Sequence, residues 1–333
     1  MVTLTSLMSW RRLGFVQFAV SNSHYRLPIN YTFFLHLPCL ASVIPFICFS
    51  MKTIKLLLFT FFLLTGSNIL FGDDEETKIF NSMPSSPTVK PKKPSKVLVY
   101  SHASGFKHSS IPTGVKALRI MAQKTKAFDP TFTVKTDEFT KKGLAKYDQI
   151  IFNNCTHVQK AFSENAQRTA ILNFISEGKS FVGFHSASDG GIPQWPEYTE
   201  MIGGCFAGHP WNAGGMWPFF IEDPTHPINS AFKKSEFKFS DEIYQYKNYD
   251  RSKLRILIGL DAVKSGKKGN SKTNDYPVSW VRSYGKGRIF YSNFGHNKAT
   301  WWTPFMLQHF MDGIQWALGD LKGSSKPILQ KKI

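Results

Sequence analysis

Short runs of apolar residues recur along the chain, and each ends in a polar tip that contains a histidine. The runs begin at Val97, Ile150, Phe181 and Ile289, and their tips end at His102, His157, His185 and His296. Strands that are apolar on both faces are typical of parallel sheets covered by helices. Ligands of such sheets bind beyond the carboxyl ends of the strands. The pattern therefore predicts that these histidines lie at one functional edge.

Segments with helical periodicity alternate with the apolar runs. We expect helices from about 110, over 140–146 and over 163–177, with a further strand over 132–136. Residues 278–284 and 288–294 flank a Gly-Lys-Gly turn and predict a hairpin. The last helix is the clearest, because one face collects Leu307, Phe310, Met311, Ile314, Ala317 and Leu318. Strands that alternate with helices predict an α/β fold with a mostly parallel sheet.

The chain divides into five expected regions. Residues 51–72 have a basic start, an apolar centre and a small polar exit, which are typical of an export signal. Because an export signal begins a protein, we expect residues 1–50 to be mistranslated upstream sequence; the alternatives are an unusually long leader or an internal membrane anchor that is retained. Residues 73–95 predict a disordered linker, 96–322 one folded domain and 323–333 a basic tail. We therefore expect a secreted or periplasmic protein that contacts a membrane only through its export signal.

The chain is basic, with 41 Lys and Arg against 23 Asp and Glu. Five of the basic residues and none of the acidic ones lie in 1–72, so a processed chain has 36 against 23, a net charge of +13. Much of the excess lies in 90–96 and 264–268, which lack the interleaved aromatic residues of a platform for single-stranded nucleic acid. We therefore expect no nucleic-acid partner.

Six segments, in order, resemble the ThuA-like (trehalose utilisation) family. They are SGFKHSSIP at 104–112, FVGFHSASD at 181–189, GCFAGHP at 204–210, DEIYQY at 241–246, YPVSW at 276–280 and GKGRIFYSNFGH at 285–296. The resemblance covers essentially all of 96–322. It implies a flavodoxin-like α/β fold with helices on both faces of the sheet, related to the class I glutamine amidotransferases. It also implies a role in carbohydrate metabolism, with a small carbohydrate as the partner.

The resemblance does not imply glutamine hydrolysis. That reaction needs a cysteine at a sharp turn from strand to helix, where a histidine activates the thiolate. Here the run from Phe181 reaches His185 instead, and Cys155 follows a different strand. With Cys39 and Cys48 in the doubtful leader, Cys155 and Cys205 remain as one disulfide or two free thiols.

His185, Asp189 and Glu242 are the candidate catalytic residues. His185 follows a predicted buried strand, and histidine as a residue type titrates near neutral pH, which suits proton transfer to and from a sugar. Asp189 follows within about one turn and is expected to orient the imidazole of His185 or to share its ligand. Glu242 belongs to the acidic pair of a family segment. The alternatives are a buried structural histidine and a solvated strand edge.

Five further residues are candidates for substrate binding. One precedes a predicted helix start, where free N–H groups attract oxygen-rich ligands. Two are amides at a strand end, and two are imidazoles in loops that contain glycine. Capping and turn roles are the alternatives for all five, which are His108, Asn153, Asn154, His209 and His296.

These residues favour an exported enzyme that acts on a sugar or keto-sugar by acid–base chemistry. No cofactor is predicted, because the sequence has no HExxH or comparable pair of metal ligands. A divalent metal remains an alternative, since several imidazoles with Asp189 and Glu242 would satisfy an open zinc site. A metal-dependent hydrolase and a non-catalytic carbohydrate-binding module are therefore the competing functions. Nothing in the sequence sets the oligomeric state.

Overall fold

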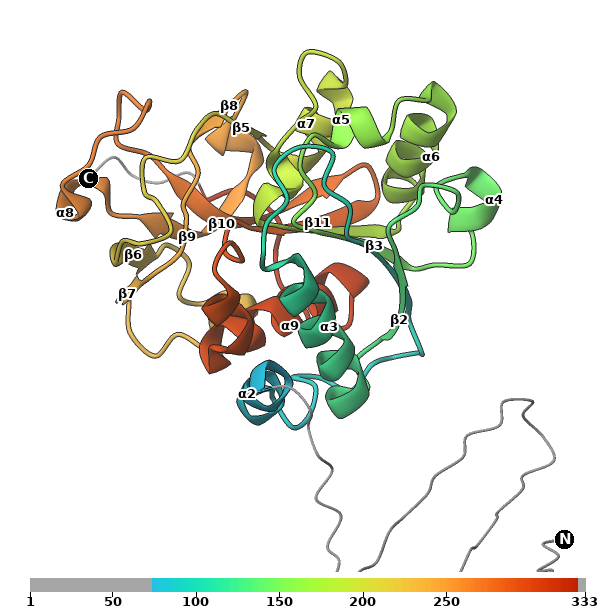
Figure 1. Cartoon of the computed structure of the whole chain (residues 1–333), viewed down its shortest axis with the longest axis horizontal. Helices are drawn as coiled ribbons and strands as arrows, with labels where there is room; N and C mark the ends of the chain where they lie inside the picture. Colours follow the sequence, from blue (N-terminus) through green and yellow to red (C-terminus); the bar gives the residue numbers. More distant parts are fainter. Residues whose placement is uncertain (1–73, 329–333) are drawn as a thin grey trace, which may run out of the picture. The chain divides into compact units, whose positions relative to one another are not determined.

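The computed structural model describes residues 74–328, and the expected leader and export signal lie outside them. A nine-stranded sheet forms the centre of the described chain, with helices on both faces (Figure 1). In spatial order its strands are β2 Asp129–Thr133, β1 Lys96–Tyr100, β3 Gln149–Asn153, β4 Ser180–Phe184, β11 Gly287–Ser292, β10 Pro277–Tyr284, β9 Arg255–Leu260, β6 Trp217–Ile221 and β7 Glu236–Phe239.

The pairing within this sheet confirms the predicted α/β class. The five strands from β2 to β11 pair in parallel, and the remaining pairs are antiparallel. Only β10 and β6 run against the others, so the sheet is mostly parallel. A second, two-stranded sheet pairs β5 Cys205–Phe206 with β8 Tyr246–Lys247.

Each face of the large sheet has its own hydrophobic core. Along β1, Val97 and Val99 belong to one core, whereas Leu98 and Tyr100 belong to the other, as the two-residue period of a strand requires. The first core packs against α2 Asp74–Ser82, α3 Ile111–Thr125 and α9 Pro304–Leu318. The second packs against α4 Lys141–Leu144, α5 Val158–Ala161, α6 Asn165–Ser176 and α7 Pro196–Ile202.

Short helical segments complete the described chain. α8 Ala262–Ser265 is α-helical, and four pieces are 3-10 helices, namely η1 His185–Ser188, η2 Pro227–Asn229, η3 Arg251–Lys253 and η4 Lys298–Trp302. In residues 74–328, no helix has both the length and the hydrophobicity needed to cross a membrane.

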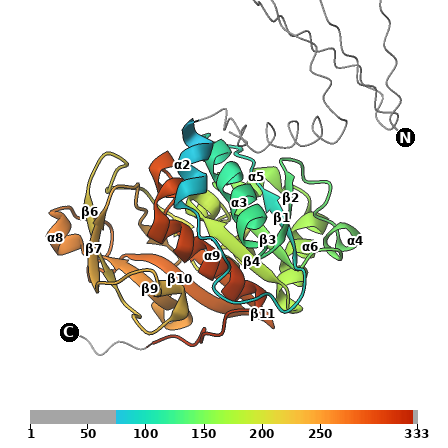
Figure 2. The same ribbon diagram turned by 90° about the horizontal axis from the view of Figure 1, so that it is seen from below.

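The prediction of a disordered linker over 73–95 is wrong for the part that the structure describes. Figure 2 shows α2 beside α3 and α9, and Ile79 of α2 is fully buried in the first core. Beyond α2, Thr88 hydrogen-bonds to Asp312, and the backbone of Val89 bonds to the side chain of Gln315 at 3.3 and 2.7 Å. These contacts fix the segment because α9 offers it both polar partners and apolar surface.

Several predicted boundaries shift by a few residues. The strand expected over 132–136 is β2 at Asp129–Thr133, with Pro130 at the edge of the sheet, where the missing N–H costs no interstrand bond. The predicted hairpin is confirmed as β10 and β11. The region between the predicted strand at 181–185 and the hairpin also contains α7, β5 and β6.

Candidate functional site

Four predicted site residues meet beyond the carboxyl ends of the central strands. His108 precedes α3, His185 follows β4, His296 follows β11, and Glu242 lies between β7 and β8. Each side chain offers one possible ligand atom, and these four atoms lie within 4.8 Å of one another. We call these four residues the His/Glu cluster.

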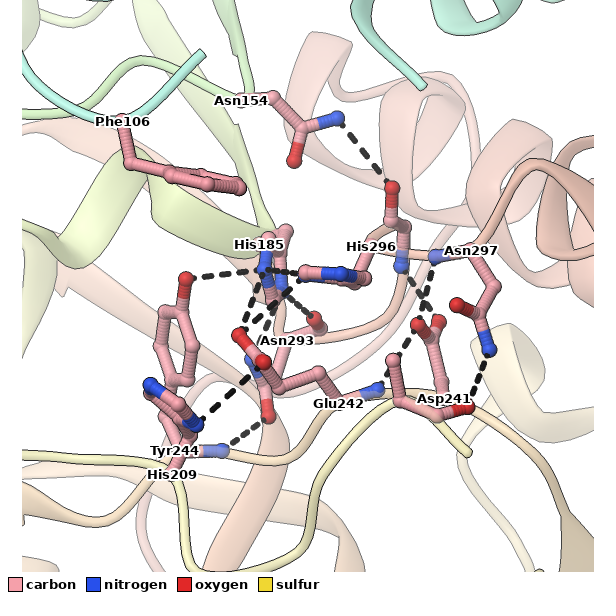
Figure 3. Close-up of polar contacts among 12 residues, drawn as sticks. Phe106, Asn154, His185, His209, Asp241, Glu242, Tyr244, Asn293, His296 and Asn297 are labelled. Atoms are coloured by element: carbon pink, nitrogen blue, oxygen red, sulfur yellow. Dashed lines mark hydrogen bonds and ion pairs between the residues drawn. The ribbon is translucent and has the colours of Figure 1, made fainter. Parts of the chain in front are cut away.

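The closest contacts in the cluster join three of its members (Figure 3). His185 Nε2 lies 3.3 Å from His296 Nδ1, and Glu242 Oε1 lies 3.2 Å from His296 Nδ1 and 3.7 Å from His185 Nε2. The ring of His108 lies edge-on to both imidazoles, with centroids 4.8 Å from His185 and 4.9 Å from His296. The four side chains thus converge from four separate segments of the chain.

The backbone places His185 at the sharp turn from β4 into η1. Its φ of 47° is in the left-handed region, which costs a non-glycine residue free energy and is enriched at functional sites. The Nδ1 atom lies 2.7 Å from the carbonyl oxygen of Asn293. Because a carbonyl only accepts, Nδ1 carries the proton and Nε2 presents its lone pair to the cluster.

Burial and neighbouring imidazoles set the protonation of the cluster. Burial, and then the nearby His108 and His296, hold the pKa of His185 well below its ordinary value. Burial likewise lowers the pKa of His108 to about 4. For His296 burial also lowers the pKa, but hydrogen bonding and the charge of Glu242 outweigh it, so the net shift is upward. His108 and His185 are therefore neutral at pH 7, the form that binds metals.

Glu242 connects the cluster to the protein surface. While Oε1 faces His185 and His296, Oε2 lies 3.3 Å from Nδ1 of His209. The side chain of His209 is 50% exposed, whereas that of Glu242 is 11% exposed. His209 therefore stays near the predicted site but contacts the carboxylate from its solvent side.

Asp241 holds the loop that carries His296. Its buried carboxylate accepts from the backbone N–H groups of Gly295 at 2.7 Å and Asn297 at 2.8 Å, and from the hydroxyl of Thr300 at 2.7 Å. It also accepts from the backbone N–H of Glu242 at 3.0 Å. The sequence identified Asp241 and Glu242 as an acidic pair. In the structure Glu242 belongs to the His/Glu cluster, whereas Asp241 supports the loop that carries His296.

Asn153 ends β3 and Asn154 follows it; their side chains lie 3.4 Å apart, but their other partners differ. Asn154 Nδ2 donates to the carbonyl of Gly295 at 3.3 Å, so this side chain also supports the loop that carries His296 (Figure 3). Asn153 Nδ2 instead bonds to Ser101 Oγ at 3.1 Å and to the carbonyl of Ile111 at 3.2 Å. Asn153 thus ties β3 to the chain after β1 and to α3.

The predicted pairing of His185 with Asp189 is wrong. Nδ1 of His185 donates to the carbonyl of Asn293, and Nε2 contacts the hydroxyl of Tyr244. Asp189 Oδ1 instead lies 3.6 Å from Nδ1 of His157. The 3-10 turn after His185 carries Asp189 to the neighbouring strand end instead. Asp189 therefore has another histidine as its partner.

Two residues near the cluster were not predicted from the sequence. The hydroxyl of Tyr244 lies 2.8 Å from His185 Nε2, and the ring of Phe106 lies edge-on to His108 with centroids 4.9 Å apart. Tyr244 follows Glu242 by two residues, a spacing that places both side chains on one face of an extended segment. That alternation is the signal that would have identified Tyr244.

The thiols give no support for an amidotransferase-type nucleophile. Cys155 and Cys205 are both buried and free, so the alternative with two free thiols holds. Burial raises the pKa of Cys155 well above its ordinary value, which keeps the thiol protonated and unreactive.

The donor set of the cluster fits a divalent first-row metal. Zinc binds imidazole nitrogens and carboxylate oxygens at about 2.0–2.2 Å, so tetrahedral ligands lie about 3.4 Å apart. The three closest separations, 3.2, 3.3 and 3.7 Å, bracket that spacing. The bond from His185 Nδ1 to a backbone carbonyl is the usual support of a ligating histidine. In addition, His108 Nδ1 is buried without a hydrogen-bond partner among residues 74–328.

Solved structures similar to this chain share its fold. A thua-like protein from Bacteroides uniformis is 20% identical, with a TM-score of 0.56 over 69% of this chain and 94% of its own. One from Parabacteroides merdae is 17% identical, with a TM-score of 0.51 over 70% and 93%. No curated protein matches significantly. These likenesses support the flavodoxin-like α/β fold expected from the sequence.

The family comparison covers most of the described chain. Residues 96–317 match the model of a family described as trehalose utilisation, which links the chain to carbohydrate metabolism. All four members of the His/Glu cluster lie within the matched residues. The chain therefore belongs to the ThuA family.

Proposed function

We propose that this protein is a carbohydrate-active enzyme whose reaction takes place at a divalent metal ion held by the His/Glu cluster. The observation that carries the proposal is the convergence of four ligand atoms within 4.8 Å in a mostly buried site. Membership of the trehalose utilisation family supports a sugar as the substrate. A bound divalent metal would polarise a sugar oxygen or lower the pKa of a water molecule.

The residues around the cluster provide the remaining chemistry. Burial keeps the pKa of Tyr244 well above its ordinary value, so its phenol is a proton donor for a developing negative charge near His185. His209 is half exposed and contacts the Glu242 carboxylate from its solvent side. These two groups suit the cleavage or isomerisation of a sugar or keto-sugar.

Acid–base chemistry without a metal is the second candidate. It is favoured by the hydroxyl of Tyr244, which already lies 2.8 Å from His185 Nε2 and can share a proton with it. In this case His185, Glu242 and Tyr244 act directly on the substrate. A non-catalytic carbohydrate-binding module would use the same side chains as hydrogen-bonding groups without turnover.

Metal content and turnover distinguish these functions. We expect the purified full chain to contain about one metal ion, and chelation followed by added Zn²⁺ to abolish and then restore product formation from a panel of disaccharides and keto-sugars. His185→Ala should lose both metal and turnover. His309→Gln is the matched control, because His309 is equally buried but bonds to Ser279 and Ile228, outside the cluster.

Each outcome assigns one of the three functions. Turnover that survives complete metal removal would contradict the metal centre and favour acid–base chemistry. Sugar binding without any product would favour the binding module. The export signal and a secreted or periplasmic location belong to the same proposal, and N-terminal sequencing of the mature protein tests them separately.

A further inference from the structure

We infer that Phe106, His157 and Asp189 form a second subsite beside the His/Glu cluster, which receives the second ring of a two-ring carbohydrate. This inference rests on the proposed function, because it assumes that the first ring binds at the cluster. Asp189 was predicted to serve His185, and the structure pairs it with His157 instead.

The subsite lies at the same edge of the sheet as the cluster. His157 is the N-cap of α5, which follows β3, and Asp189 follows η1, which continues directly from β4. Like His185, His157 has a left-handed backbone, with a φ of 51°. The neighbouring strands β3 and β4 are therefore each followed by a histidine with a left-handed backbone, one in each subsite.

The loop that leads to His108 connects the two subsites. The backbone N–H groups of Ser104 and Gly105 bond to the carbonyl and hydroxyl oxygens of Thr156, each at 3.1 Å. The ring of His157 covers Gly105 so closely that a Cβ there would lie 2.2 Å from its Cδ2 atom. The loop is thus fixed against His157 just before it presents Phe106.

The chain connectivity limits the separation of the subsites. Gly105 is three residues from His108, so their Cα atoms are at most about 11 Å apart. Asp189 is four residues beyond His185 through a 3-10 turn, which rises about 2.0 Å per residue. Asp189 pairs with His157 and with no member of the cluster. If the first ring of a substrate binds at the cluster, we infer that its second ring contacts Asp189.

The exposed groups of the subsite match the surface of a sugar ring. Phe106 is 68% exposed although it is fully apolar, and its ring contacts His108 of the cluster. The side chains of His157 and Asp189 are 39% and 18% exposed. An aromatic face with an imidazole and a carboxylate suits the C–H face and the hydroxyl groups of a sugar.

Calorimetry with two sugars tests the second subsite. The zinc-loaded full chain is titrated with trehalose, which has two rings, and with methyl α-D-glucopyranoside, which has one. We expect Phe106→Ala and His157→Asn each to weaken trehalose binding about tenfold, which corresponds to the loss of one contact worth about 1.4 kcal/mol. Binding of the one-ring sugar and the zinc content should remain unchanged.

Two further variants make the test specific. Phe106→Trp keeps an aromatic face and should retain trehalose binding. Val263→Ala removes an equally exposed apolar side chain on α8 and should change neither titration. Melting temperatures confirm that each variant is folded.

The outcomes separate this inference from the proposed function. If both sugars bind and Phe106→Ala and His157→Asn bind trehalose as the wild type does, the second subsite is wrong and the metal site stands. Equal weakening for both sugars would also overturn it, because these residues would then contact the first ring. If neither sugar binds the wild type, the carbohydrate function fails and the subsite fails with it.

Discussion

His185 shows how one residue combines backbone strain, orientation and charge. The turn after β4 gives it a left-handed φ, the carbonyl of Asn293 fixes its tautomer, and burial keeps it neutral. This chain thus presents an imidazole at the turn from strand to helix where glutamine hydrolysis would need a cysteine. Side chains that contact this imidazole are the most informative ones to change.

Tyr244→Phe should strengthen zinc binding and abolish turnover. Metal binding at His185 Nε2 must displace the hydroxyl of Tyr244, which now lies 2.8 Å away, and that hydrogen bond is worth about 1 kcal/mol. Without the hydroxyl, the affinity for Zn²⁺ should rise about fivefold. Competition with a chromophoric chelator measures the affinity, and a lower affinity in the variant would show that Tyr244 supports the metal rather than competing with it.

Asp241→Asn should loosen the loop that carries His296. The amide replaces a carboxylate that accepts four hydrogen bonds, and its NH₂ group must face backbone donors. We expect the free energy of unfolding to fall by about 2–4 kcal/mol in urea denaturation, with weaker zinc binding. Asp137→Asn, at an exposed position, is the control and should change stability by less than about 0.5 kcal/mol. A variant that is as stable as the wild type and binds zinc normally would show that Asp241 does not hold the loop that carries His296.

At the scale of elements, hydrophobic periodicity predicted the regular half of the fold and missed the irregular half. Strands β1, β3 and β4 have mostly apolar centres and helix α9 is long and amphipathic, so the local pattern suffices. The order of β9, β6 and β7 depends on pairing between distant segments, which no local pattern encodes.

The same limit applies to the site. Histidines at strand ends could be expected to converge, because parallel strands share an edge. The partner of Asp189 could not be predicted, because the direction of the turn after β4 decides whether it meets His185 or His157. Helix α2 was missed because its polar residues masked Ile79 and Met83, which are four residues apart on one face.

Ile79→Ala tests whether α2 is part of the folded domain. Ile79 is fully buried, so its truncation leaves a cavity and should reduce the free energy of unfolding by about 2–5 kcal/mol. Ser86→Ala, at an exposed position of the same segment, should have little effect. Chemical denaturation compares the two. Equal stability of both variants would contradict the packing of α2 and would support the prediction of a disordered linker.

At the scale of the whole molecule, buried histidines connect stability to pH. His309 lies on α9 and contacts Ile228 of η2 and Ser279 of β10. Complete burial lowers its pKa from 6.5 to about 4. The unfolded chain therefore takes up this proton below pH 6.5, whereas the folded chain does so only near pH 4. The stability contributed by neutral His309 is full above pH 6.5 and is lost as the pH falls towards 4.

His309→Gln should consequently cost more stability at pH 8 than at pH 4.5. The variant lacks the titrating group, so the wild type alone loses this contribution on acidification, and the difference between them should shrink by about 2 kcal/mol. Urea denaturation of both proteins at the two pH values measures it. A difference that is constant, or that grows in acid, would show that His309 is not held neutral in the fold.

The metal centre is tested most directly by anomalous X-ray diffraction from crystals of the full chain grown with Zn²⁺. Data collected on both sides of the zinc absorption edge should give one strong peak, about 2.0–2.2 Å from a ligand atom of each member of the His/Glu cluster. Tyr244 should then have lost its contact with His185 Nε2. A cluster without an anomalous peak, in which that contact persists, would contradict the account.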